Sequence, residues 1–274
     1  MTMPPTLLLD VDGTLAPFNQ SAGTKAVTGL LVKLFGNEGL KFGAEFSSLY
    51  DAFSSLHHGN ESPELIALKN ILNSYKVQLP QEFKERSENF MWSRELWLKH
   101  ISEVHKLNLG WEQIISMTDT YWEAISFHSP IYSAIKEYLE ELTKKDLLLF
   151  LVVASDRRLA LINGSITYDP KVPEKKKVKR VMEQGLSRFF RPQQVITGDP
   201  YNKPSSEFWQ KCMKTAGLSD PSEAIVVDDA KAVVISAVKF GFMGCVLDRA
   251  GHYKRAEVES YGISYIIELN QLKI

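Results

Sequence analysis

The sequence predicts an α/β protein with a doubly wound, Rossmann-like parallel sheet as its core and an inserted all-helical cap domain. Short apolar runs, typical of buried parallel strands, alternate with helical patterns in the C-terminal half of the chain. The first two strand-like runs are separated by more than 130 residues, far more than a parallel crossover needs. With 274 residues, of which 44% are hydrophobic, the chain can bury a full core.

The core prediction starts from Thr6–Val11, an apolar run that ends in acids, as in a buried strand whose carboxyl end carries function. The next comparable run is Leu147–Ala154. Further strands are predicted at Gln194–Thr197, Ala224–Val227, Met243–Leu247 and Ser264–Leu269, and helices at Ile131–Lys144, Lys176–Gly185, Pro204–Ala216 and Ala230–Phe240. This alternation predicts a core formed by residues 1–17 and 129–274.

The inserted segment, residues 18–128, has several helical patterns and few β-like runs, and it contains four of the five tryptophans. We interpret those rings as packing in a helical cap. Farther along, Gly164–Lys177 is polar, with two prolines and a run of lysines, and we predict a loop with a solvated surface. The cap helices are predicted at Thr24–Phe35, Ala44–Leu56, Pro63–Tyr75, Pro80–His105 and Trp111–Ser126.

The charge balance and the cysteine content limit the kinds of partner and metal site that we expect. The 32 basic and 33 acidic residues nearly cancel, so no field of one sign exists to gather nucleic acid or anionic lipid. We expect a small-molecule partner, and neither nucleic acid nor a membrane. Cys212 and Cys245 are too few and too far apart for a disulfide framework or a cysteine-based zinc site. With no signal-like start and no apolar span, we expect a cytoplasmic location, with the nucleus also open.

The chemistry-bearing motif is Asp10-Val11-Asp12-Gly13-Thr14, directly after the first strand. Strand alternation points Asp10 and Asp12 the same way, and Gly13 allows a sharp turn whose backbone N–H groups can face a phosphate. One carboxylate can attack phosphorus, and a neighbouring carboxyl can protonate the leaving alcohol. The alternative is an ordinary strand-end turn.

This motif resembles the first motif of the haloacid dehalogenase (HAD) superfamily, which implies that Asp10 is the nucleophile and Asp12 the acid/base. Ser155, in VVASDRRL, resembles the second motif, whose hydroxyl binds a phosphoryl oxygen. Lys203, in YNKP, resembles the third, which neutralises the nucleophile and the phosphate. Gly13, Thr14, Ser155, Asp156 and Lys203 form the predicted phosphate-binding set.

Asp228-Asp229 follows a strand-like run and resembles the fourth, acidic motif of the superfamily. Paired acids at a buried strand end repel each other unless a cation compensates, and Mg²⁺ prefers oxygen ligands. The resemblance predicts a Mg²⁺ site formed by Asp10, Asp12, Asp228 and Asp229, with Asp12 binding through its backbone carbonyl. Many members carry a further acid where this chain has Val233 and Val234.

The resemblance implies a magnesium-dependent phosphatase that cleaves a small phosphate monoester through an aspartyl-phosphate, in the helical-cap branch near the REG-2-like and fungal HAD-like hydrolases. Two alternatives stay open. One is haloacid dehalogenation on the same scaffold, against which Asp12 and the Asp228-Asp229 pair argue. The other is a non-catalytic member that binds a phosphorylated ligand or a protein partner, which the valines at 233 and 234 favour.

Overall fold

The computed structural model describes residues 6–57, 62–79, 90 and 92–272. The chain divides into two compact units. The core unit consists of the described residues of Met1–Phe18, Ser129–Ser155 and Lys177–Ile274, and the helical unit of those of Asn19–His128 and Asp156–Lys176. The sequence prediction assigns residues 156–176 to the core, whereas this division by contacts groups them with the helices.

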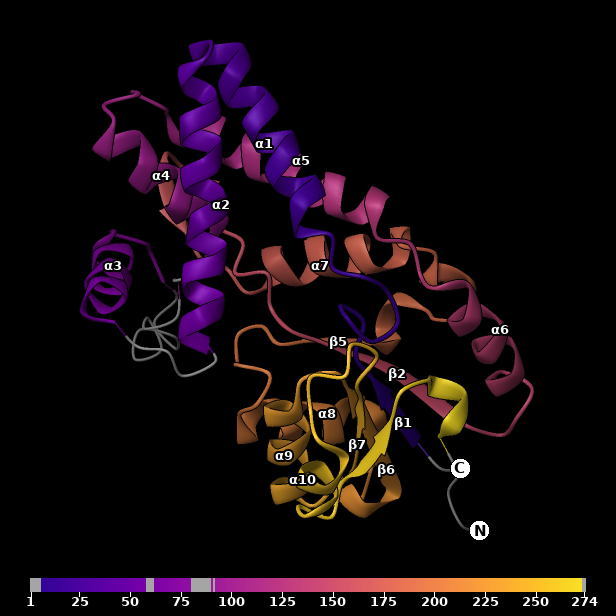
Figure 1. The fold of residues 1–274 in the computed structure, drawn as a ribbon. Coiled ribbons are helices and arrows are strands. Elements are labelled where there is room, and N and C mark those ends of the chain that lie inside the picture. The colour runs from indigo at the N-terminus through magenta and orange to yellow at the C-terminus, as the bar shows by residue number, and fades with distance from the viewer. Residues whose placement is uncertain (1–5, 58–61, 80–89, 91, 273–274) are drawn as a thin grey trace. The chain divides into compact units, whose positions relative to one another are not determined.

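The core unit is built on a six-stranded sheet of order β5-β2-β1-β6-β7-β8, in which every neighbouring pair is parallel. Figure 1 shows β1, β2, β6 and β7 side by side. Because β1 is central, its last residue, Leu9, pairs with both Leu151 and Val227, and the residues that follow these strands meet at one edge. The strands are β1 (Thr6–Leu9), β2 (Leu148–Val153), β5 (Val195–Thr197), β6 (Ala224–Asp228), β7 (Met243–Leu247) and β8 (Ser264–Ile266).

Side-chain alternation along β1 builds the two faces of the sheet. Leu7 and Leu9 pack into one apolar cluster with α6 (Ser133–Leu142) and α7 (Lys171–Glu183). Leu8 points the other way, into a cluster with α8 (Ser206–Ala216) and α9 (Lys231–Phe240). Helices therefore cover both faces, as the predicted doubly wound architecture requires, and a short helix, α10 (Arg255–Glu259), follows β7. The two thiols, Cys212 and Cys245, are fully buried, one in each cluster.

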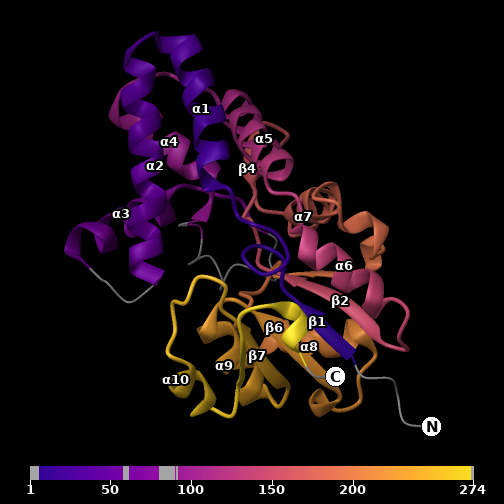
Figure 2. The same ribbon diagram turned by 45° about the vertical axis from the view of Figure 1, so that its right-hand side comes forward.

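The helical unit contains α1 (Gln20–Phe35), α2 (Glu38–His57), α3 (Pro63–Ser74), α4 (Arg94–Val104) and α5 (Trp111–His128). In Figure 2, α1 and α2 lie side by side, with α4 and α5 beside them. Their interior is aromatic: the ring of Trp97 stacks on Phe53 at 5.7 Å, and Phe46 meets Tyr121 edge-on. Tryptophan thus packs the interior, as predicted. None of the helices in the described part of the chain is both long and apolar enough to cross a membrane.

The prediction of a solvated loop at Gly164–Lys177 is wrong. Strand β4 (Ser165–Thr167) lies at its start and forms a hairpin with β3 (Ala160–Ile162), which precedes the segment, and α7 already begins at Lys171. Helix formation turns the lysine run onto different faces, so that Lys177 is buried. Of the helix predicted over Pro80–His105, residues 80–89 and 91 lie outside the described residues, and α4 begins at Arg94.

Candidate active site

The first motif forms a tight turn at the carboxyl end of β1. The N–H of Asp10 still donates to Val227, 2.9 Å away, so this residue continues the sheet ladder. The N–H groups of Thr14, Leu15 and Ala16 then all donate to the carbonyl of Val11. Gly13 takes a φ of +91°, in the region that glycine adopts without strain. The turn leaves the Asp10 side chain buried at the sheet edge, with 5% of its surface exposed.

Lys203 is the cation of this cluster. Its Nζ hydrogen-bonds Oδ1 of Asp10 and lies 2.6 Å from Oδ2 of Asp228. Burial alone would lower the pKa of Lys203, but the two carboxylates outweigh burial and raise it. The ammonium group therefore stays charged between the side chains that follow β1 and end β6. The structure thus brings together three of the predicted site residues.

Three carboxylates gather at the same place. Asp10, Asp228 and Asp229 each offer an oxygen within 4.8 Å of the others. Burial and mutual repulsion raise the pKa of Asp10 to about 7 and that of Asp229 to about 8. Oδ2 of Asp10 is buried and has no hydrogen-bond partner among the described residues. A Cβ at Gly13 would collide with the Asp229 carboxylate, so the turn is shaped around that group.

Backbone contacts fix the orientation of the paired acids. Oδ1 of Asp228 accepts from the N–H of Ala230 at 2.8 Å. The N–H of Asp229 donates to the hydroxyl of Thr14 at 3.1 Å, which ties the turn after β6 to the turn after β1. Thr14, predicted to bind phosphate, therefore joins the first and fourth motifs. An orphaned carboxylate oxygen beside further carboxylates fits a hard divalent cation, so the residues present are suited to Mg²⁺.

The Asp12 side chain contacts two cations of α7, Lys177 and Arg180. Its Oδ2 accepts from Nζ of Lys177 at 2.9 Å, and its Oδ1 accepts from Arg180 at 3.0 Å, while the second guanidinium nitrogen of Arg180 also bonds Oδ2. Burial would raise the pKa of Asp12, but the two cations hold it well below its ordinary range. The Asp12 carboxylate is not in the three-carboxylate cluster described above. Sequence reasoning missed Lys177 and Arg180.

The two remaining predicted residues, Ser155 and Asp156, belong to different units of the chain. Ser155, which follows β2, hydrogen-bonds the carboxylate of Asp199. The backbone carbonyl of Asp199 in turn accepts from Nζ of Lys211 at 2.8 Å, so the loop after β5 is tied down beside Ser155. Asp156 is buried but belongs to the helical unit. Asp199 was not predicted, and only its position after a strand would have signalled it.

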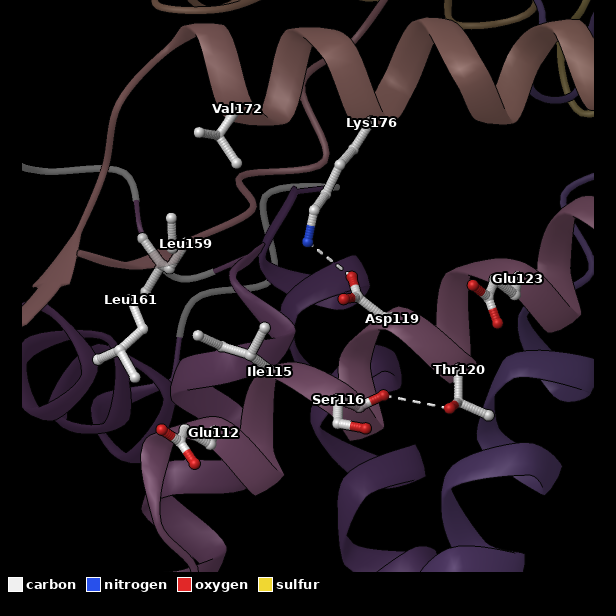
Figure 3. Close-up of a pocket in the computed structure, with 11 residues that line it drawn as sticks. Glu112, Ile115, Ser116, Asp119, Thr120, Glu123, Leu159, Leu161, Val172 and Lys176 are labelled. Carbon is white, nitrogen blue, oxygen red and sulfur yellow. Dashed lines mark hydrogen bonds and ion pairs between the residues drawn. The ribbon is translucent and has the colours of Figure 1, made fainter. Parts of the chain in front are cut away.

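The helical unit holds a pocket of its own, about 530 Å³ in volume. Figure 3 shows Ile115, Leu159 and Leu161 on its apolar side and an ion pair between Lys176 and Asp119 across it. Oδ1 of Asp119 accepts from Lys176 at 2.7 Å and also from buried Arg158. The carboxylate is thus already neutralised by the unit's own cations.

The parallel sheet, the helices on both of its faces and the acids at its carboxyl edge define a Rossmann-like α/β protein with an acidic site. Residues 4–241 match the family model described as haloacid dehalogenase-like hydrolase. The chain therefore belongs to the haloacid dehalogenase-like hydrolases. A comparison with proteins of curated function finds no match.

Solved structures agree on the fold. A 2-haloacid dehalogenase from Pseudomonas syringae pv. Tomato DC3000 matches with a TM-score of 0.56 and 16% identity, over 98% of this chain and 96% of that chain. The HAD hydrolase YfnB from Bacillus subtilis, bound to magnesium, gives 0.53 and 12%, over 97% and 94%. A protein described as a β-phosphoglucomutase from Thermotoga maritima gives 0.52 and 15%, over 96% and 94%. At these identities the likeness concerns the fold alone.

Proposed function

We propose that this hydrolase is a magnesium-dependent phosphatase that cleaves a small phosphate monoester through an aspartyl-phosphate on Asp10. The observation that carries the proposal is the cluster of Asp10, Asp228 and Asp229 around the ammonium group of Lys203. Dehalogenation of a haloacid needs one attacking carboxylate and no metal site. Three clustered carboxylates, two of them buried, with one cation are better suited to a metal ion and a phosphoryl group.

The residues divide the work as follows. An oxygen of Asp10 attacks phosphorus, and the bond from phosphorus to the leaving oxygen breaks as the new P–O bond forms. Lys203 offsets negative charge on the nucleophile and on the transferred group. We assign the hydroxyl groups of Ser155 and Thr14 to the phosphoryl oxygens. The N–H groups of Gly13 and Thr14 already donate within the turn, to the carbonyls of Ala16 and Val11.

Water must then hydrolyse the aspartyl-phosphate to regenerate Asp10. Asp12 is the predicted acid and base for the leaving alcohol and for that water. Asp10, Asp228 and Asp229 would hold Mg²⁺, with Asp12 contributing through its backbone as predicted. When bound, the ion would supply positive charge that stabilises the transferred phosphoryl group.

The ion pairs of Asp12 favour a second candidate. A carboxylate paired with Lys177 and Arg180 stays ionised and carries no proton to donate, and a halide leaving group needs no proton. Hydrolytic dehalogenation of a small haloacid would therefore tolerate this arrangement. The same argument within the phosphatase proposal favours esters whose leaving group is stable as an anion.

One assay separates these candidates. Purified protein is incubated with an aryl phosphate and, in parallel, with a 2-haloacid, each with Mg²⁺ and with a chelator. We expect phosphate release that depends on Mg²⁺, no halide release, and loss of turnover in Asp10→Asn, whose amide cannot attack. Halide release that persists with chelator would establish the second candidate. Protein inert on both substrates would favour the non-catalytic alternative.

A further inference from the structure

Lys177 and Arg180 bind the Asp12 carboxylate in a defined geometry. Arg180 engages both carboxylate oxygens through its two terminal nitrogens, and Lys177 adds a further bond to Oδ2. A forked contact to both oxygens fixes the plane of a carboxylate as well as its position. Rotation of the Asp12 side chain would break at least one of these bonds.

Burial shows which of the three side chains is presented to solvent. The side chains of Lys177 and Arg180 are 2% and 4% exposed, whereas that of Asp12 is 22% exposed. A molecule arriving from solvent therefore meets Asp12 first, and the two cations lie behind it. This order argues against the cations as a subsite for an anionic part of the substrate and in favour of a supporting role.

One helix supplies both cations. Lys177 and Arg180 are three residues apart on α7, a spacing that places side chains on one helix face. Lys179, between them, points elsewhere: its side chain is 68% exposed and lies 3.6 Å from Glu183 in an ordinary surface pair. The burial of two cations on the inner face is thus specific to the face that meets Asp12.

We infer that Lys177 and Arg180 are positioning residues of the active site, which hold the Asp12 carboxylate in a single orientation for its part in the reaction. This inference rests on the proposed function, because it assigns Asp12 a reacting role. Both cations bond the carboxylate oxygens of Asp12, and we infer that both act through Asp12. A merely structural ion pair would stabilise the fold without linking its loss to Asp12 in catalysis.

The test is a kinetic double-mutant cycle. Lys177→Met and Arg180→Met are measured alone and in combination with Asp12→Asn, with Lys179→Met as the matched control on the same helix. We expect each single loss to lower kcat about 10- to 100-fold, as a misplaced reacting group does, with KM changed little. On the Asp12→Asn background the same losses should lower kcat less than about twofold further, because their target is already gone. Lys179→Met should leave kcat unchanged.

A conservative variant, Arg180→Lys, controls for misfolding of the methionine variants. Arg180→Lys keeps the charge but removes the fork, so it should fold as the wild type and still lose kcat, with a pH profile altered relative to wild type. Full kcat in Arg180→Met or Lys177→Met would overturn the inference. So would losses that multiply in full on the Asp12→Asn background.

A second cycle keeps this inference distinct from the proposed function. The same variants are compared by their unfolding equilibrium constants, where we expect the Arg180 and Asp12 substitutions to be non-additive by about tenfold. Wild-type protein inert on both test substrates would refute the proposed function and the catalytic consequence together. Additive unfolding constants would refute the contact with Asp12 itself, whatever the activity.

Discussion

At the scale of single residues, Gly13 constrains the site most tightly. Its φ of +91° strains any residue with a Cβ, and the added carbon would meet the carboxylate of Asp229. Only glycine allows the turn after β1 and the acid after β6 to approach this closely. The predicted sharp turn at Gly13 is present, but the N–H groups of Gly13 and Thr14 donate to carbonyls within it. The role of Gly13 that the structure supports is therefore steric.

Gly13→Ala should therefore cost about 1 to 3 kcal/mol of stability and weaken activation by Mg²⁺. Urea unfolding and a magnesium titration of activity measure the two effects. The control is Gly29→Ala in α1, where the new methyl group meets nothing within 4 Å. There the exposed helical site should gain up to about 1 kcal/mol. Equal effects at the two glycines would show that the close approach to Asp229 is unimportant.

The residues of the site differ in how far the sequence could place them. Asp10, Lys203 and the Asp228-Asp229 pair each follow or end a strand in a motif with few alternatives, and the structure brings them together. Lys177 lies 165 residues from Asp12, and no local pattern encodes that contact. Its i, i+3 relation to Arg180 could be read from the helix predicted over Lys176–Gly185, but that spacing does not say which residue the helix face contacts.

At the scale of elements, the hairpin of β3 and β4 shows what the sequence analysis overlooked. Asn163 and Gly164 have φ values of +49° and +76°, as the central residues of a type I′ turn do. Asn-Gly between two short apolar runs is the strongest local signal of a hairpin, and this pair stands at the start of the segment predicted as a loop. The six core strands, by contrast, were predicted within a few residues, because buried parallel strands give continuous apolar runs.

Another element-scale feature is the buried pair that ties the segment after β2 to α4. Arg158 donates to Glu95 at 2.9 Å, and the two side chains are 3% and 0% exposed. Glu95 also accepts from Ser93 and Thr118, so its charge is fully engaged inside the helical unit. Removing the cation would leave a buried carboxylate without its main partner.

Arg158→Met should thus destabilise the protein by about 3 to 5 kcal/mol, and adding Glu95→Met should restore part of the loss. The measurement is urea unfolding followed by tryptophan fluorescence, which reports chiefly on the helical unit because four of the five tryptophans lie in residues 19–128. Lys99→Met, which removes a partly exposed pair with Glu103 at 3.1 Å, should change stability by less than about 1 kcal/mol. A similar cost at both positions would contradict the importance of burial.

At the scale of the whole molecule, the acidic cluster couples stability to pH. Without a cation, the folded protein holds protons on Asp10 and Asp229 more tightly than the unfolded chain, because their pKa values rise from 3.8 to about 7 and about 8. Their contribution to stability is complete below pH 3.8 and is lost as the pH rises through the raised values. The lowered pKa of Asp12 acts the opposite way, and only at acidic pH below this window.

Mg²⁺ should accordingly raise the Tm little at about pH 6 and much more at about pH 8.5, where the carboxylates are ionised and need a cation. Thermal scans with and without Mg²⁺ at the two pH values test this. Asp229→Asn should shrink the difference between them, since it removes one of the repelling charges. A magnesium effect of the same size at both values, or none at either, would argue against a metal site at these carboxylates.

The reactivity of the two buried cysteines reports on unfolding of the protein. Burial raises the pKa values of Cys212 and Cys245 to about 12, so in the folded state the thiolate that reacts with alkylating reagents is almost absent. Both thiols belong to the core unit, one on each face of its sheet. The rate at which a thiol reagent labels the wild-type chain therefore follows the transient opening of the core unit, and it times that event without the introduction of any probe.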